Sequence, residues 1–294
     1  MTAPPQSAAL VALLRLGRRP AQAYAEPVQD AGSALEVLER ELAETAGQGS
    51  LMPPEPEPLL ARAALEIERW RADGIQVLTL LDRDYPDNLR AVYDRPPLIF
   101  VRGGLHPSDT KAVAVIGSRR ASPAGLARAG EVSEQLVRSG YTVFSGLAAG
   151  IDAAAHAAAL SAGGRTIAVI GTGLAHCYPP QNAGLQDRLA HECAVVSQFW
   201  PDEPGSRRSF PLRNAVMSGL SLATVIVEAS PTSGTRIQAR LALSHGRPVF
   251  VSQAMLGAQW ARELAGLPGV YVFESPDQIS VAVDGLSSPG ALIG

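Results

Sequence analysis

The chain has 294 residues, of which 46% are hydrophobic and 5% aromatic, and its formal net charge is −3. This length accommodates one large domain or two smaller ones, and the charge excludes a protein that attracts nucleic acid through its global field. Any anionic partner must therefore meet a local patch. Two cysteines outside any CxxC motif, no signal-peptide pattern and no apolar run of membrane length predict a reduced, cytoplasmic protein that does not enter a membrane.

The first part of the chain predicts a mainly helical N-terminal domain, residues 1–100. Leu and Ala recur at helical spacings in three segments, residues 7–16, 34–46 and 59–72. Residues 48–58 are rich in Pro and Gly, which predicts a linker between the helices. A strand is expected at 74–81, and a short apolar segment follows at 98–101.

From about residue 105 the pattern changes to strands that alternate with helices. Strands are expected at residues 112–116, 141–145, 166–170, 194–197, 223–228, 248–251 and 270–273. Helices are expected at residues 123–139, 151–162, 181–191, 213–220, 234–245 and 257–265. This alternation predicts an α/β protein with a Rossmann-like, doubly wound, mostly parallel sheet over residues 105–283, preceded by the small helical domain. Residues 284–294 are rich in Gly, Ser and Pro and predict a flexible tail.

A small-residue turn follows the first strand of the expected sheet. Gly117, Ser118 and Arg119 stand between that strand and the next helix. A glycine lets the backbone approach a phosphate, the helix N-terminus offers N–H groups, and an arginine adds a fork of donors. The alternative is a plain tight turn with a solvated arginine pair. The segment is neither G-x-G-x-x-G nor a P-loop, so no nicotinamide or other cofactor is expected.

The second strand ends in Ser145 and Gly146, which can present a hydroxyl and a backbone N–H to an anion. Asp152 stands near the start of the next helix, where a carboxylate caps unpaired N–H groups. His156 lies four residues further on the same face. A structural pair, with a capping Asp and an orienting His, is favoured over an acid–base couple because no nucleophile has a suitable context.

The third strand ends in Gly171 and Gly173, which continue the series of small residues at strand ends. Tyr178 follows in a proline-rich loop, where its ring can stack on a base or close the core. A metal site would have to use the residues His176, Cys177, His191 and Cys193. Their spacing fits no common zinc pattern, so no metal is expected.

The densest basic stretch of the expected sheet domain is R-R-S-F-P-L-R-N. It contains Arg207, Arg208, Phe210, Arg213 and Asn214. Arginines beside an aromatic ring suit single-stranded nucleic acid, with phosphates on the guanidinium groups and bases on the ring. The alternative is a solvated loop.

A last small-residue turn follows the strand at 223–228. Ser233, Gly234 and Thr235 can cap the next helix and bind an anion at its N-terminus. Glu228, at the end of the strand, is a candidate acceptor for a ribose or an arginine.

Taken together, the motifs resemble the DNA-processing protein A family (DprA, also called Smf), over about residues 70 to 251. The quoted motifs are G-S-R, S-G-L-A-x-G-I-D-x-x-A-H, T-I-A-V-I-G-x-G-L-x-x-x-Y-P, F-P-x-R-N and S-G-T. The resemblance implies a Rossmann-like fold, binding of single-stranded DNA, a homodimer and loading of the RecA recombinase during natural transformation, with no established catalytic activity. The DNA- or phosphate-binding residues expected are Gly117, Ser118, Arg119, Ser145, Gly146, Gly171, Gly173, Arg207, Arg208, Phe210, Arg213, Asn214, Ser233, Gly234 and Thr235, with Asp152, His156 and Tyr178 structural.

Some positions depart from the family pattern. Ala149, Leu212 and Ala215 stand where the family usually has arginine, and residues 252–254 replace its usual Pro-Gly. Fewer phosphate contacts predict weaker or altered DNA binding. The C-terminal winged-helix domain of many members is not expected here.

A second resemblance is to nucleotide phosphoribohydrolases with the motif P-G-G-x-G-T-x-x-E. Gln238 stands where the carboxylate of that motif would be, and a neutral amide cannot act as the acid or base of glycosidic cleavage. This disfavours the enzyme but leaves a nucleotide-sensing module as an alternative.

Self-association is expected to use apolar residues late in the sheet domain. The candidates are residues 249–251 with Met255, Leu256 and Trp260. The alternative is that these residues form a buried strand and helix of the core.

Overall fold

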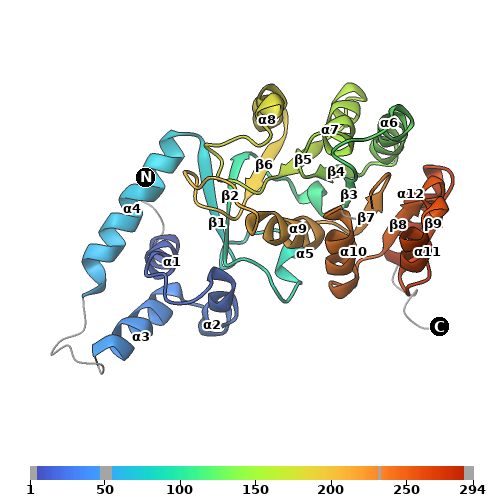
Figure 1. The fold of residues 1–294 in the computed structure, drawn as a ribbon. Helices are drawn as coiled ribbons and strands as arrows, with labels where there is room; N and C mark the ends of the chain where they lie inside the picture. Colours follow the sequence, from blue (N-terminus) through green and yellow to red (C-terminus); the bar gives the residue numbers. More distant parts are fainter. Residues whose placement is uncertain (1–4, 47–54, 231–232, 288–294) are drawn as a thin grey trace.

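The computed structural model describes residues 5–46, 55–230 and 233–287, and places one nine-stranded sheet at the centre of the molecule (Figure 1). Its strand order is β1-β2-β6-β5-β4-β3-β7-β8-β9. The strands are β1 (Ile75–Thr79), β2 (Leu98–Gly103), β3 (Ala112–Ile116), β4 (Thr142–Ser145), β5 (Thr166–Val169), β6 (Ala194–Ser197), β7 (Ala223–Ile226), β8 (Val249–Ser252) and β9 (Val270–Phe273). Strands β3 to β9 are parallel to one another, which confirms the α/β, Rossmann-like prediction.

Helices cover both faces of the parallel strands. Val113 and Val115 belong to the apolar cluster formed with α6 and α7, whereas Ala114 and Ile116 belong to the cluster that includes α9 and α10. A strand buried on both faces needs apolar residues at every position, which is why these strands are continuous apolar runs. The helices are α1 (Pro5–Arg15), α2 (Ala25–Ala31), α3 (Ala34–Ala46), α4 (Pro56–Ala72), α5 (Asp87–Arg90), α6 (Pro123–Arg138), α7 (Ile151–Ser161), α8 (Ala183–Glu192), α9 (Ser209–Leu220), α10 (Thr235–Ser244), α11 (Gln259–Ala265) and α12 (Asp277–Ser287).

The segment between the N-terminal helices and β3 belongs to the sheet. Strand β1 pairs antiparallel with β2, and β2 pairs antiparallel with β6. The expected boundary near residue 100 therefore cuts β2, because the ladder that it forms with β6 joins it to the parallel strands. The helical part packs on this side of the sheet through rings: Trp70 stacks on Trp200 at 5.8 Å between centroids, and the Arg15 guanidinium lies 3.9 Å from the Trp200 ring centre.

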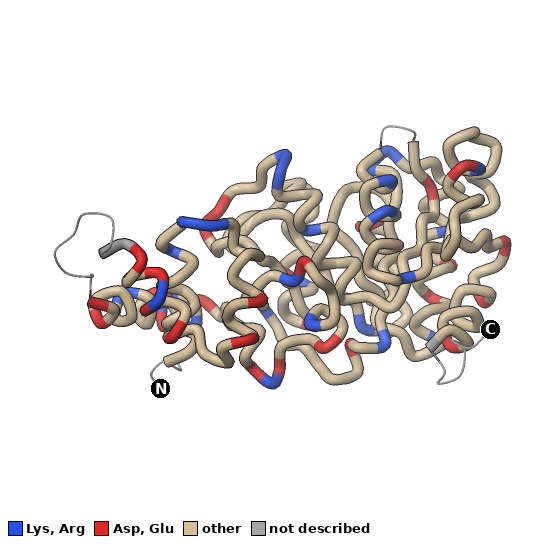
Figure 2. The backbone as a smooth tube through the Cα atoms, turned by 90° about the horizontal axis from the view of Figure 1, so that it is seen from below, with Lys and Arg blue, Asp and Glu red and all other residues tan. Residues whose placement is uncertain are grey.

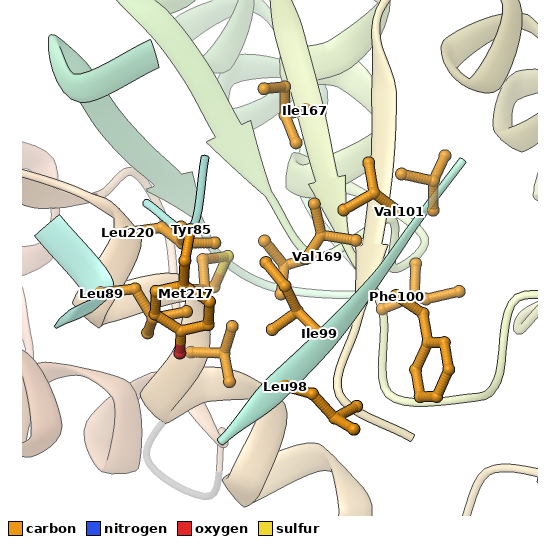
Figure 3. Close-up of a cluster of buried hydrophobic side chains, with 14 of the residues drawn as sticks. Tyr85, Leu89, Leu98, Ile99, Phe100, Val101, Ile167, Val169, Met217 and Leu220 are labelled. Carbon is orange, nitrogen blue, oxygen red and sulfur yellow. The ribbon is translucent and has the colours of Figure 1, made fainter. Parts of the chain in front are cut away.

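An apolar cluster beside β2 and β5 holds α9 in place (Figure 3). Met217 and Leu220 of α9 lie beside Leu89 of α5 and Tyr85, and all four are buried. Gly219 faces this contact, and a Cβ there would lie 2.7 Å from a Leu89 methyl carbon. The cluster fixes the helix whose first turns approach the strand ends.

Three boundaries differ from the sequence predictions. Residues 284–287 continue α12 instead of starting the expected tail, and 288–294 lie outside the described residues. Of the expected linker, residues 48–54 lie outside the described residues and 56–58 begin α4. The basic stretch 207–214 is mostly helical, since α9 begins at Ser209 and Pro211 falls in its first turn, where its missing N–H is not needed.

Candidate functional site

A pocket of about 380 Å³ opens at the carboxyl ends of β3 and β7. Strand β3 lies between β4 and β7. The strands that follow β3 in the chain are added on its β4 side, whereas β7 and the later strands lie on its other side, so the strand order reverses at β3. Open α/β sheets bind ligands at this kind of switch point, outside the carboxyl ends of the strands. The pocket brings together nine of the expected DNA- or phosphate-binding residues, together with Asp152: Gly117, Ser118, Arg119, Phe210, Arg213, Asn214, Ser233, Gly234 and Thr235.

The turn after β3 is both tight and part of the pocket. The Ser118 N–H donates to the Glu228 carbonyl at 2.6 Å, and the Ser118 carbonyl accepts from the Ile151 N–H at 3.2 Å. A Cβ on Gly117 would lie 2.5 Å from a side-chain carbon of Ile151, so only glycine fits there without a shift. The two interpretations of this turn, tight turn and phosphate pocket, are therefore compatible.

Arg119 stands beside two aromatic rings at the edge of the pocket. Its guanidinium carbon lies 5.2 Å from the Phe210 ring centre and 5.8 Å from that of Tyr178, and the two rings are 5.5 Å apart. Arg119 is exposed, and Tyr178 is 48% exposed. Of the two roles considered for Tyr178, its exposure favours stacking on a base over closing the core. We call Arg119, Tyr178 and Phe210 the arginine–aromatic cluster.

Arg213 is buried under the pocket and is only 6% exposed. Its Nη1 donates to the carbonyl oxygens of Gly146 and Val169, the latter at 2.7 Å, and its Nε donates to Asn214 at 3.0 Å. Gly146 is required here because a Cβ would collide with the guanidinium. Burial lowers the pKa of Arg213, and Asp152 opposes that effect. Arg213 thus ties α9 to the ends of β4 and β5.

Asp152 and His156 act within the fold and have different partners. Asp152 Oδ2 accepts from the N–H groups of Gly146 at 3.2 Å and Ala148 at 3.4 Å, so it caps the loop before α7 and not the helix itself. Burial raises the pKa of Asp152, which Arg213 opposes. His156 Nδ1 lies 2.7 Å from the Thr166 hydroxyl, and burial lowers its pKa to about 3, so the ring is neutral at pH 7.

Several expected residues lie outside the pocket. The buried Ser145 hydroxyl donates to the Val115 carbonyl at 2.6 Å, so it is not available to an anion. Gly171 makes room for the Phe210 ring, since a Cβ there would lie 2.8 Å from a ring carbon, and Gly173 makes room for the Trp200 and Pro201 carbonyls. Arg207 and Arg208 are exposed just before α9.

The carboxylate at the end of β7 is also engaged. Glu228 accepts from the Ser122 hydroxyl at 2.5 Å and from the Ser122 N–H at 3.0 Å, at the start of α6. It holds this helix start instead of facing a ribose. Within the described part of the chain, no three His, Cys, Asp or Glu residues form a group that could hold a metal ion.

The start of α10 supplies the remaining wall. The Ser233 and Thr235 hydroxyls are hydrogen-bonded to each other, and the Thr235 N–H donates to Ser233 Oγ at 3.1 Å. Figure 2 shows Lys and Arg positions close together around this part of the molecule. One turn further along α10, Gln238 also lines the pocket, with Ile116 and Met217. Sequence reasoning noted Gln238 only as a replaced carboxylate and missed Ile116 and Met217, because their place in the wall depends on how the helices pack against the strand ends.

The family described as DNA recombination-mediator protein A matches residues 76–265. The chain belongs to this family. It is 42% identical over 172 residues to the DNA processing protein DprA of Streptococcus pneumoniae, and 39% identical over 188 residues to the Smf protein of Synechocystis. These matches cover 58% and 63% of the chain, but only 61% and 47% of the two relatives.

Solved structures of family members extend the likeness beyond the matched segment. The crystal structure of S. pneumoniae DprA superposes with a TM-score of 0.74 at 29% identity, over 96% of this chain and 98% of that one. The Helicobacter pylori DNA processing protein A, a structure described for its single-stranded DNA binding mode, gives a TM-score of 0.63 at 25% identity, over 71% of this chain and 95% of that one. The helical N-terminal part therefore belongs to the shared architecture of the S. pneumoniae protein. No helix of the described residues is long and apolar enough to cross a membrane.

Proposed function

We propose that this chain binds single-stranded DNA across the pocket and the arginine–aromatic cluster. The observation that carries the proposal is the position of Arg119, an exposed guanidinium beside the Phe210 and Tyr178 rings at the mouth of a pocket. Phosphates bind to guanidinium groups and unpaired bases stack on aromatic rings, so this arrangement suits a strand whose bases are free. In a duplex, the bases are stacked on one another and cannot reach such rings.

The pocket favours binding over cleavage. A phosphoribohydrolase needs a free carboxylate at the glycosidic bond. Here Asp152 is engaged by loop N–H groups, Glu228 is bound to Ser122, and the neutral Gln238 lines the wall. We therefore infer a binding protein without hydrolase activity.

The biological setting that we propose follows the relatives. Proteins named DNA processing protein DprA are 35–42% identical to this chain, and the H. pylori structure is described for its binding of single-stranded DNA. We propose that this cytoplasmic chain acts as a homodimer that protects incoming single-stranded DNA and loads RecA in natural transformation.

Fluorescence anisotropy tests the proposed DNA binding. A labelled oligo-dT and a duplex of equal length are titrated with the protein at two salt concentrations. The single strand should bind more tightly, and its affinity should fall steeply as salt rises. Equal affinity for the two forms, or an affinity independent of salt, contradicts the proposal. Release of free base from a nucleotide panel, detected by chromatography, would favour the hydrolase instead.

A further inference from the structure

Gln238 is an exception among the polar groups of the pocket. Its side chain is 1% exposed, and neither the amide nitrogen nor the amide oxygen has a hydrogen-bond partner among the described residues. A buried carboxamide offers two N–H donors and one acceptor, and leaving them unpaired destabilises the free protein. Buried polar groups are normally satisfied, so an unpaired amide in the wall of a pocket is suited to pair with a ligand group.

The other polar groups at this wall already have partners. The hydroxyls of Ser233 and Thr235 bind each other, Ser118 Oγ accepts from the Arg120 N–H, and Asp152 accepts from the loop before α7. None of them needs a ligand for its own satisfaction. Among the buried polar side chains of this lining that the structure describes, Gln238 is therefore the one whose amide atoms are both unpaired.

The lining of the pocket indicates what kind of group fits. Ile116, Met217 and Phe210 contribute apolar surface to it, and the pocket volume of about 380 Å³ lies at the lower end of the usual range for small-molecule sites. A phosphate group only accepts hydrogen bonds, so it could pair with the amide nitrogen but would leave the oxygen unpaired. A nucleobase has flat apolar faces and an edge with a donor next to an acceptor.

We propose that Gln238 binds the hydrogen-bonding edge of one nucleobase that a bound single strand inserts into the pocket. This inference rests on the proposed function and adds a residue that selects for base edges over phosphate or plain apolar rings. A half-turn of the amide exchanges its donor and acceptor, so Gln238 can match different bases. Arg119 and the two rings of the arginine–aromatic cluster bind the neighbouring phosphates and bases of the strand.

Anisotropy with a shape-matched base analogue tests this role. One oligonucleotide carries thymine, and the other carries 2,4-difluorotoluene, an aromatic ring of similar shape that lacks thymine's strong hydrogen-bonding edge. The wild-type protein should bind the thymine strand about tenfold more tightly, because the analogue leaves the amide unpaired. Gln238→Met should bind the two strands with equal affinity.

Matched variants separate this inference from the proposed function. Gln253→Met removes an exposed glutamine and should keep the wild-type preference for thymine. Arg119→Ala should weaken both complexes equally and keep their ratio. Circular dichroism confirms that each variant is folded. If Gln238→Met does not fold, Gln238→Leu replaces it in the same measurement. A wild-type protein that binds both strands equally, or a Gln238 variant that keeps the preference, overturns the inference while DNA binding stands. Failure to bind either strand overturns both.

Discussion

Replacing Gln238 by methionine should stabilise the free protein, although most substitutions of buried residues destabilise. The carboxamide is 1% exposed and unpaired among the described residues, so folding removes its hydrogen bonds to water without replacing them. Such a group costs about 1–3 kcal/mol. Methionine has a similar length and no strongly polar atom, so the free energy of unfolding should rise by about 1–3 kcal/mol, with Tm rising by about 2–4 °C per kcal/mol.

Thermal and urea unfolding, followed by circular dichroism without DNA, measure this change. Asn182→Leu is the control, because the Asn182 amide is also buried but donates to the Leu147 carbonyl at 2.8 Å. Removing that donor leaves the carbonyl unpaired and should lower Tm. A Gln238→Met protein that melts below the wild type would mean that the amide has a structural partner, and it would refute the burial argument.

Three further predictions concern DNA affinity, pH and assembly. Arg119→Ala should weaken binding of oligo-dT and reduce the salt slope by about one unit, and Arg120→Ala should do so less, because Arg119 lies beside the Phe210 and Tyr178 rings; equal effects would refute the role proposed for Arg119. His156 becomes protonated below about pH 6.5 in the unfolded chain but only near pH 3 in the folded protein, so the free energy of unfolding should fall as pH falls between these values. His156→Gln should make this decline shallower, as measured by urea unfolding at several pH values. An unchanged decline contradicts the effect of burial on His156. Light scattering should give about twice 30.7 kDa for the wild type, and Leu256→Glu should halve this mass while circular dichroism stays folded; a wild-type monomer contradicts the proposed homodimer.

Some of the apolar residues predicted to form the homodimer interface are buried in the fold. Residues 249–251 form the buried core of β8, which pairs with β7 on one side and β9 on the other, and Met255 is buried as well. These residues cannot form an interface without opening the sheet. Leu256 and Trp260 keep partial exposure and remain the candidates.

The strands of the parallel sheet could be predicted to within one or two residues. A run such as 112–116 is apolar at every position because both faces are buried, and small residues mark its end. The attachment of β1 and β2 could not be predicted, because it depends on pairing across about one hundred residues of chain. The helix expected at 213–220 begins four residues earlier, at Ser209, and therefore includes Phe210, because Pro211 is tolerated in a first turn.

The sequence predicted that the site residues lie together at the carboxyl ends of the strands, but the role of each residue was harder to predict. Arg119 and Arg213 look equivalent in the sequence, and only packing shows that one is exposed and the other bound to two carbonyl oxygens. Gln238 drew attention as a replaced carboxylate, but its lack of partners depends on the surroundings of α10. Local patterns place such side chains near the site, whereas burial decides what each can do.

The stacked rings of Trp70 and Trp200 make the chain a natural optical reporter. The protein has three tryptophans, and two of them meet where the N-terminal helices pack on the sheet, whereas the Trp260 ring lies 6.0 Å from the Arg236 guanidinium on α10. Two indoles at 5.8 Å couple electronically and shape the near-ultraviolet circular dichroism, so that spectrum registers docking of the helical part. Emission from Trp260 senses the helix beside the pocket. A Trp260→Phe protein therefore separates events at the two ends of the molecule without any attached dye.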